Sequence, residues 1–369
     1  MLVNTFNLWG YIMKYEIDFL SNSSVNQDSD SILFRYMPEG AQEFVHVLYD
    51  GGVKAFGETI ERHLKDYYDT EKLDCVIISH PDNDHTSGII ELFGKIEIGK
   101  IYMNCPWNYI ESLWPYINDG RKTKDSLKQE LYGSYPNVKR IEDLANEYNI
   151  PVLPIFQGEY INDEIKVLSP SKTFYIEQIV DSSKNSLDEK RSGFKFTEAV
   201  NSIKKFIVES LTGADTLREN VSTSAENETS VILHLGLSTY NVLLTGDAGI
   251  KALNAAYDYG ICNNIQFSNY NLIQIPHHGS RHNISSSTLD KITGFTNMNC
   301  VENRKACASV AKDSNHPRKS VVNAFIKRNF KVSATYGNTI CYHSDDMPIR
   351  DGWGPVGGLA FSTSVESWD

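Results

Sequence analysis

Short apolar runs of strand length alternate with longer amphipathic stretches along most of the 369 residues. Near the start, three short runs of apolar residues are followed by a stretch in which Phe56, Ile60 and Leu64 recur at helical spacing. Such alternation predicts an α/β protein, in which helices cover the sheets. The segments concerned are strands at residues 15–20, 31–37 and 43–49 and a helix at residues 54–68.

Polar residues follow three of the apolar runs directly. Residues 73–79 (LDCVIIS) form a continuous apolar run, typical of a buried central strand, and lead into the sequence HPDNDH at residues 80–85. In the second half, a strand at residues 240–245 ends just before Asp247, and a strand at residues 271–275 ends at the sequence PHHGS. Because sites in α/β sheets collect at the carboxyl ends of strands, the three clusters can meet at one place.

The middle of the chain interrupts this pattern. Residues 171–226 are polar, partly helical around residues 198–211, and carry no recognisable chemistry. We interpret them as an insertion or lid within a single domain that covers residues 1–369. The alternation resumes afterwards and is expected to end with a strand at residues 359–365.

The composition is that of an ordinary globular protein, with 22% charged and 41% hydrophobic residues, which excludes collagen-like, disordered and disulfide-scaffold classes. No apolar run approaches the roughly 20 residues that a membrane-spanning helix needs, and the first residues do not resemble a signal peptide. The six cysteines form no C-x-x-C pair and are expected to be reduced. These features predict a cytoplasmic protein without a membrane part, translated from Met1 or Met13.

The net charge of −12 argues against a protein that coats nucleic acid non-specifically. The charge reverses locally, because Asp313 is the only acidic residue among many basic ones in residues 304–331. A solvated amphipathic helix explains Lys327 and Arg328. The remaining basic residues near the loop that carries His316 are candidates for binding a substrate phosphate: Lys312, Arg318 and Lys319.

The HPDNDH sequence concentrates two imidazoles and two carboxylates within six residues. Adjacent carboxylates repel each other, so a divalent metal ion that neutralises them is the favoured interpretation. The alternative is a polar turn in which Asp84 caps a helix that starts near His85. Five of the ten histidines lie in loops that follow strands, which favours a shared metal site: His80, His85, His277, His278 and His316.

The order of the motifs resembles the metallo-β-lactamase superfamily, and specifically the hydrolase domain of the DNA-uptake competence protein ComEC, here free-standing. The resemblance spans about residues 43–343 and implies a four-layer αβ/βα sandwich with a helical insertion and a dinuclear metal site at the edge of the sheets. The motifs that carry it are DGG (50–52), HPDNDH (80–85), NETS (227–230), LLTGD (243–247), PHHGS (276–280) and residues 309–317.

The resemblance implies two divalent metal ions, zinc or manganese, that share Asp247 as a bridging ligand. His80 and Asp82 would hold the first ion. Many members have a histidine at the position of Asp82, and the added carboxylate favours manganese over zinc. The residues at 227–230 stand where a third histidine of the first site is otherwise found, so this site is the less complete of the two.

The second ion would be held by Asp84, His85 and a histidine of the PHHGS sequence. Two histidines are available there, and His277 is preferred to His278. The resemblance also implies that His316 faces the substrate, where it or Asp84 would assist proton transfer. Ser280, which ends the PHHGS sequence, is a further candidate for substrate binding.

Two divalent ions about 3.5–4 Å apart activate a water molecule and stabilise an anionic transition state. This chemistry suits a phosphodiesterase, and the resemblance favours a nuclease that acts on DNA, with RNA as a further candidate. The alternative is a small-molecule hydrolase, such as a nucleotide or phosphocholine-type phosphodiesterase or a thioester or lactone hydrolase. A cytoplasmic nuclease of this class would serve DNA processing or antiviral defence, restrained by a regulatory protein partner.

Overall fold

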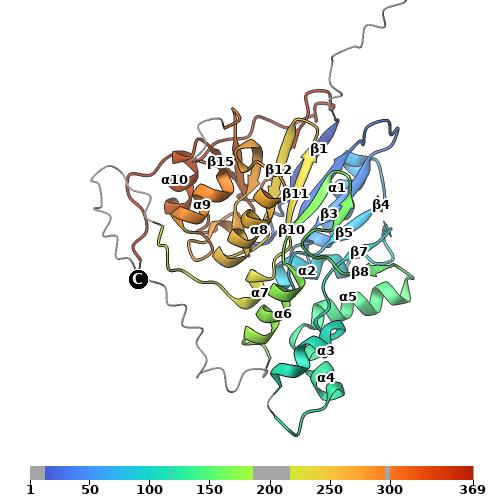
Figure 1. Ribbon diagram of the computed structural model, residues 1–369. Helices are drawn as coiled ribbons and strands as arrows, with labels where there is room; N and C mark the ends of the chain where they lie inside the picture. The colour runs from blue at the N-terminus through green and yellow to red at the C-terminus, as the bar shows by residue number, and fades with distance from the viewer. Residues whose placement is uncertain (1–12, 118, 186–216, 296–299, 369) are drawn as a thin grey trace, which may run out of the picture.

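The computed structural model describes residues 13–117, 119–185, 217–295 and 300–368, and two seven-stranded sheets form its centre (Figure 1). The first sheet has the strand order β16-β1-β2-β3-β5-β7-β8. Its strands are β1 (Tyr15–Phe19), β2 (Ile32–Tyr36), β3 (Val45–Tyr49), β5 (Cys75–Ile77), β7 (Ile101–Tyr102), β8 (Val152–Leu153) and β16 (Ile340–His343). A two-stranded sheet joins β4 (Lys72–Leu73) to β6 (Glu97–Ile98).

The second sheet has the order β15-β14-β13-β12-β11-β10-β9. Its strands are β9 (Tyr160–Asn162), β10 (Ile165–Ser169), β11 (Ile232–Leu237), β12 (Tyr240–Leu244), β13 (Tyr270–Gln274), β14 (Lys305–Ala308) and β15 (Lys331–Ala334). A short 3-10 helix, η5 (Pro276–Gly279), follows β13 directly.

Helices cover the outer face of each sheet. The helices on the first sheet are α1 (Phe56–Tyr68), α2 (Asn83–Ile90), α3 (Ile110–Leu113), α4 (Lys124–Ser134), α5 (Pro136–Glu147) and α6 (Lys172–Asp181). Those near the second sheet are α7 (Ala225–Glu228), α8 (Ile250–Cys262), α9 (Ser286–Thr293) and α10 (Lys319–Lys327). The four layers that the sequence predicts, helix–sheet–sheet–helix, are therefore confirmed (Figure 1).

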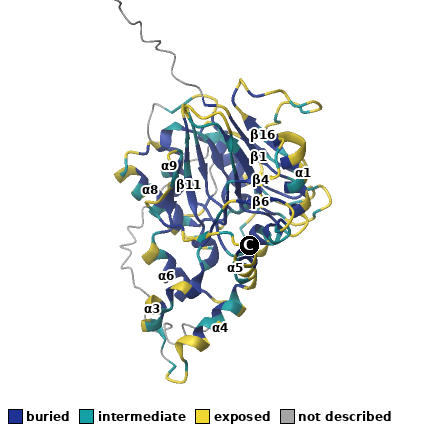
Figure 2. Cartoon of the chain, turned by 90° about the vertical axis from the view of Figure 1, so that its right-hand side faces the viewer, coloured by how far each residue is buried: buried dark blue, intermediate teal, exposed yellow. Residues whose placement is uncertain are grey.

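Alternating side chains build the core on both sides of each sheet. On β2, Phe34 points to the cluster between the sheets, whereas its neighbour Leu33 points to the cluster under the helices. Both side chains are fully buried, and each such burial contributes about 1.5–3 kcal/mol. Strands that are apolar on both faces therefore become the buried centre of the molecule, and the exposed residues lie mainly on helices and loops (Figure 2).

Parallel strand pairs bring the polar clusters together at one edge. The strands β3, β5, β7 and β8 run parallel to one another, as do β12 to β15. Two hydrogen bonds join the sheets there: the Tyr49 hydroxyl donates to the Val231 carbonyl at 2.7 Å, and the Val231 amide donates to the Ser79 carbonyl at 3.0 Å. The loops after β5, β12 and β13 consequently meet at this edge.

Two local expectations are changed, and a third falls outside the described residues. The expected strand at 73–79 is divided into β4 and β5, because β4 pairs with β6 outside the main sheet. Residues 359–365 form no strand: Leu359 donates one backbone hydrogen bond to Val332, and the following residues run along the surface. The expected helix at 198–211 lies outside the described residues, and the interpretation of 171–226 as an insertion stays a prediction.

Helix α2 is held against the Asp-Gly-Gly loop by direct backbone contact. The Gly51 amide donates to the His85 carbonyl at 2.7 Å, and the Gly88 amide donates to the Gly52 carbonyl at 3.0 Å. A Cβ atom on Gly88 would lie 1.9 Å from the Gly51 carbonyl oxygen. Only glycine permits this approach, which fixes the position of His85 at the start of the helix.

We therefore expect Gly88→Ala to lower the free energy of unfolding by about 1–3 kcal/mol, as overpacking does. The matched control is Gly133→Ala, on the exposed face of α4 with nothing within 4 Å of the added Cβ. That substitution should stabilise the protein by about 0.4–1 kcal/mol. Urea unfolding measures both values, and equal effects of the two substitutions would contradict the close approach.

Candidate metal centre

The Asp247 carboxylate lies at the middle of the site. It follows β12, its amide donates to the Ser230 hydroxyl at 3.1 Å, and the residue is only 3% exposed. Its Oδ1 atom lies 3.4 Å from Nε2 of His85. Its Oδ2 atom lies 3.8 Å from Nε2 of His80 and 3.5 Å from Nε2 of His277. Three imidazoles thus direct the same nitrogen to one buried carboxylate.

Contacts on Nδ1 fix the orientation of the two histidines before and within α2. Nδ1 of His85 donates to Oδ2 of Asp50 at 2.8 Å. The Ser79 hydroxyl donates to the same carboxylate at 2.6 Å, so its oxygen can accept from Nδ1 of His80 at 3.0 Å. Both imidazoles therefore carry their proton on Nδ1 when neutral and leave the lone pair of Nε2 facing Asp247.

The two histidines of η5 are oriented in the same way by other elements. Nδ1 of His278 donates to the Ser309 carbonyl at 2.8 Å. Nδ1 of His277 lies 2.8 Å from Oδ1 of Asn283, whose amide nitrogen donates to the Asp247 carbonyl at 2.7 Å. The second contact identifies the Asn283 oxygen as the acceptor for His277. Metal-binding histidines in proteins are oriented by such contacts on the remote nitrogen.

Three further carboxylates surround this group. Oδ2 of Asp84 lies 3.6 Å from Nε2 of His278, and Oδ2 of Asp82 lies 3.6 Å from Nε2 of His80. Asp30 is 1% exposed, and its Oδ2 lies 3.8 Å from Nδ1 of His278. Ligand atoms within 4.8 Å of one another come from four buried residues, Asp30, His85, Asp247 and His278.

Several of these buried atoms have no hydrogen-bond partner within the described part of the chain. Leaving such atoms unpaired is costly, by about 1–3 kcal/mol each, unless a further group binds them. Imidazole nitrogens together with carboxylate oxygens are a donor set that suits zinc or manganese. The unpaired atoms are Nε2 of His80, His85 and His278, Oδ1 of Asp247 and both carboxylate oxygens of Asp30.

Without a cation, the histidines and carboxylates of the group neutralise one another. Burial disfavours a charged imidazole, but Asp247 and Asp50 outweigh it and hold the pKa of His85 well above its usual value. Burial likewise opposes the charge of His278, yet Asp30 and Asp84 raise its pKa to about 10. Burial would raise the pKa of Asp84, but the neighbouring imidazoles lower it to about 2.

The structure brings the predicted metal ligands together and changes one local expectation, the identity of the helix cap. It is His278, not His277, whose Nε2 faces Asp84 and which belongs to the buried group with His85. Nε2 of His277 lies instead near Oδ2 of Asp247, because the left-handed backbone of η5 turns the two rings in different directions; which of the two binds the second ion stays a prediction. Asp84 does not cap α2, which begins at Asn83 with Asp82 at the cap position.

His316 lies outside the buried group and is held by an aspartate that the sequence did not single out. Its Nδ1 lies 2.9 Å from Oδ2 of Asp28, and its side chain is 27% exposed. Asp28 also accepts from the Ala311 amide at 2.8 Å and from the Ser314 hydroxyl at 2.7 Å. The loop before β2 therefore fixes the loop after β14, together with the orientation of its histidine.

The predicted substrate-binding residues lie around η5 and α10. Ser280 is buried and its amide donates to the His277 carbonyl at 2.8 Å, while the Arg318 amide donates to the Gly279 carbonyl at 3.1 Å. The Lys319 amide donates to the Glu366 carboxylate at 2.9 Å, and the Lys312 side chain is exposed. Ser280 and the Arg318 backbone therefore lie beside the histidine pair, although Arg318 is remote from it in the sequence.

Other members of the basic stretch serve the fold. Arg304 is 1% exposed, and its guanidinium donates to the Tyr270 carbonyl at 3.2 Å. Arg328, interpreted from the sequence as solvated, is 5% exposed and its Nε donates to Asp290 at 2.8 Å. Arg304 and Arg328 are therefore not available to bind a ligand, and fewer basic side chains can do so than the sequence of this stretch suggests.

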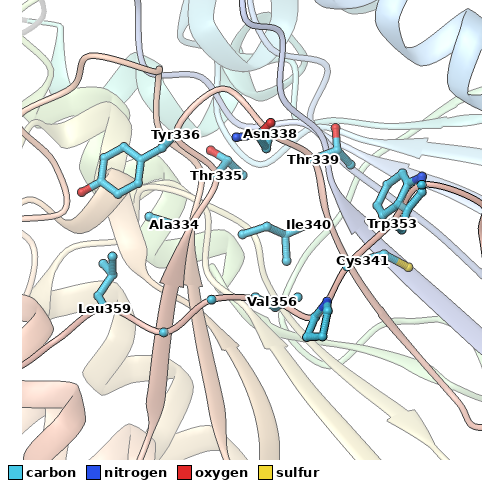
Figure 3. A pocket seen from close by; sticks show the side chains of 15 residues that line it. Ala334, Thr335, Tyr336, Asn338, Thr339, Ile340, Cys341, Trp353, Val356 and Leu359 are labelled. Atoms are coloured by element: carbon cyan, nitrogen blue, oxygen red, sulfur yellow. The ribbon is translucent and has the colours of Figure 1, made fainter.

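A separate cavity of about 640 Å³ lies between the β15–β16 turn and the C-terminal segment (Figure 3). Residues 334–341 and 352–359 supply its walls, among them Tyr336, Ile340 and Trp353. Its described lining includes none of the predicted metal ligands. The metal centre and this cavity are consequently distinct features.

Sequence reasoning missed three acidic or basic residues that contact the site. Asp28 and Asp30 lie in the polar loop before β2, where two acids precede a fully buried strand, and this was the available signal. Lys184, whose Nζ lies 2.5 Å from Oδ1 of Asp82, comes from the segment after α6. Nothing in its local sequence indicates that contact, because 102 residues separate the partners.

No helix of the described residues is long and apolar enough to cross a membrane. No protein-family model and no curated protein matches the sequence. Solved structures with a similar arrangement include a diphosphatase of the PhnP family, at 10% identity over 90% of this chain and 98% of that one, with a TM-score of 0.41. Unliganded yeast PDE1 shows 10% identity over 89% and 99%, with a TM-score of 0.43.

The metallo-β-lactamase SMB-1 bound to 2-mercaptoethanesulfonate shows 8% identity over 73% of this chain and 82% of that one, with a TM-score of 0.30. At these identities the comparisons concern the arrangement of sheets and helices alone and assign no activity. The function of the chain therefore has to be argued from the contacts of its own site.

Metal binding should release protons. In the metal-free protein His278, with a pKa of about 10, and His85 hold protons at neutral pH, whereas a histidine must be neutral to bind a metal ion. The affinity for Mn²⁺ should therefore rise as the pH increases from about 7 toward the pKa of His278. Calorimetry in two buffers of different ionisation enthalpy measures the released protons; identical binding heats in both would contradict this expectation.

Proposed function

We propose that the protein is a divalent-metal-dependent hydrolase that cleaves phosphodiester bonds, with DNA as its most suitable substrate. The observation that carries the proposal is the convergence of three oriented imidazoles on Asp247 and of a fourth on Asp84, with unpaired nitrogens and oxygens buried between them. Structural histidines are usually satisfied by protein partners, and these are satisfied on only one nitrogen.

The donor set fits two divalent ions. Asp247 offers one carboxylate oxygen to each side of the group, as a bridging ligand does. The carboxylates of Asp82, Asp84 and Asp30 make the site rich in oxygen, which supports manganese, while the imidazoles are equally suited to zinc. When bound, the ions would supply Lewis acidity and lower the pKa of a water molecule.

His316 is suited to move a proton at the edge of the site. Because Asp28 accepts from its Nδ1, the Nε2 atom is free to exchange a proton with a substrate oxygen. Its partial exposure keeps this atom accessible, unlike the fully buried His85. We propose His316 as the general acid for the leaving group and Asp84 as a metal ligand that can assist proton transfer.

Substrate recognition is proposed to use positive charge near η5. Lys312, Arg318 and Lys319 come from the loop after β14 and the start of α10, and the Arg318 backbone contacts the same loop as the histidine pair. A phosphate backbone would be attracted to these groups in an otherwise acidic chain. Ser280 would contribute a polar contact beside the histidines.

Replacing the central carboxylate tests the metal-dependent reaction. We expect Asp247→Asn to lower bound metal toward one ion per chain and to reduce turnover by several orders of magnitude, because an amide satisfies one ion well and carries no charge. Turnover is measured on plasmid DNA and bis(p-nitrophenyl) phosphate with Mn²⁺, beside elemental analysis. The control is Asp258→Asn, on the exposed face of α8. Activity within tenfold of the wild type would make Asp247 only a turn residue.

Charge reversal tests the substrate class. Lys312→Glu, Arg318→Glu and Lys319→Glu should each raise the KM for DNA about tenfold and reduce the dependence on salt by about one ion, with metal content unchanged. Lys251→Glu, on the exposed face of α8, is the charge-matched control. If DNA binding and its salt dependence do not change while a small phosphodiester is still cleaved, the small-molecule hydrolase becomes the favoured function.

A further inference from the structure

The two oxygens of Asp247 face different sets of side chains. Oδ1 lies near Nε2 of His85, at 3.4 Å, whereas Oδ2 lies near Nε2 of His277, at 3.5 Å, and Nε2 of His80, at 3.8 Å. A bridging carboxylate directs its two oxygens to two ions in the same manner. The ligands on each side of Asp247 can therefore be assigned from the distances.

The backbone of η5 places neighbouring imidazoles on different sides of this carboxylate. His277 and His278 both have left-handed backbone angles, with φ of 48° and 57°. Such angles cost about 1–2 kcal/mol for each residue with a side chain and persist where a site requires them. The two rings lie 5.7 Å apart at 65° to each other, and their Nε2 atoms face different carboxylates, Asp247 for His277 and Asp84 for His278.

Separate partners support each of the two rings. Asn283, fully buried, accepts from His277 and donates to the Asp247 carbonyl, which links this histidine to the bridging residue. His278 is instead held by the Ser309 carbonyl of the neighbouring strand end, and its Nε2 faces Asp84. The fold thus contains an independent support for the orientation of each imidazole.

The remaining carboxylates also lie on one or the other side of Asp247. Asp82 directs Oδ2 to the His80 side, at 3.6 Å from Nε2, while its Oδ1 accepts from Lys184 at 2.5 Å. The lysine offsets the charge of this carboxylate without occupying the oxygen that faces the site. Asp84 and Asp30 lie on the side of His278.

We propose that both histidines of η5 bind metal and that they serve different ions. His277 completes the first site with His80, Asp82 and Oδ2 of Asp247. His278 completes the second with Asp84, His85 and Oδ1 of Asp247. This assignment rests on the proposed metal-dependent function, and it gives the first site a second imidazole that the order of motifs along the chain does not provide.

The test replaces each histidine of the pair by glycine, because glycine adopts left-handed angles without strain and the loop should keep its path. Metal-free protein is titrated with Mn²⁺ alone, and bound ions are counted by equilibrium dialysis. The wild type should bind two ions that show spin coupling in electron paramagnetic resonance. His277→Gly and His278→Gly should each bind one ion with no coupling. His282→Ala, an exposed histidine nearby, is the control and should bind two.

Double variants identify the site that each histidine serves. His277→Gly with His80→Ala should still bind one ion, since both changes affect the first site, whereas His277→Gly with His85→Ala should bind none. Circular dichroism and thermal unfolding establish that each variant is folded. Two ions in His277→Gly, or none in the first double variant, would overturn the assignment. A wild type with one ion overturns the division into two sites, and a wild type with none overturns the proposed function as well.

Discussion

A single buried carboxylate, that of Asp247, determines the organisation of the site. It is almost fully shielded from water, and three imidazoles from two other segments approach it within 4 Å. Transfer of such a group from water is unfavourable unless positive charge accompanies it. Protonated imidazoles provide that charge in the metal-free protein, and divalent ions would provide it in the loaded one. Nearby carboxylates hold the pKa values of His85 and His278 above the usual value, so these two imidazoles can carry that charge.

The architecture supports this arrangement by making the ends of parallel strands meet. The predicted ligands follow the ends of the strands, and contacts with neighbouring residues fix the orientation of their side chains. Asp50 orients His85 and also accepts from Ser79, so one carboxylate stabilises the end of β5 and the start of α2 together. The close approach of Gly88 to the Gly51 carbonyl lets α2 pack directly against the loop that carries Asp50. The orientation of the imidazoles therefore depends on how the sheets and α2 pack together.

The two sides of the site differ in their surroundings. His278 and Asp30 are buried at the junction of the two sheets, whereas the side chain of His277 is 33% exposed and Asp82 lies beside Lys184. The loop after β14 and the start of α10 lie beside His278 and Gly279, because the Ser309 carbonyl accepts from His278 and the Arg318 amide donates to the Gly279 carbonyl. Arg304 and Arg328 do not contribute there, because their guanidinium groups are used for hydrogen bonds inside the second sheet and its helices.

The sequence by itself determined the class of fold, most of the strands and the residues of ligand type, because these depend on the local period of apolar positions and on clusters such as HPDNDH. The tertiary structure decided which atoms meet. The preference between His277 and His278, the contact of Lys184 with Asp82, and the roles of Asp28 and Asp30 depend on side chains that are remote in sequence. The orientation of an imidazole depends on the partner of its other nitrogen, and Asn283 and Ser309 reach that position only when the sheets are packed.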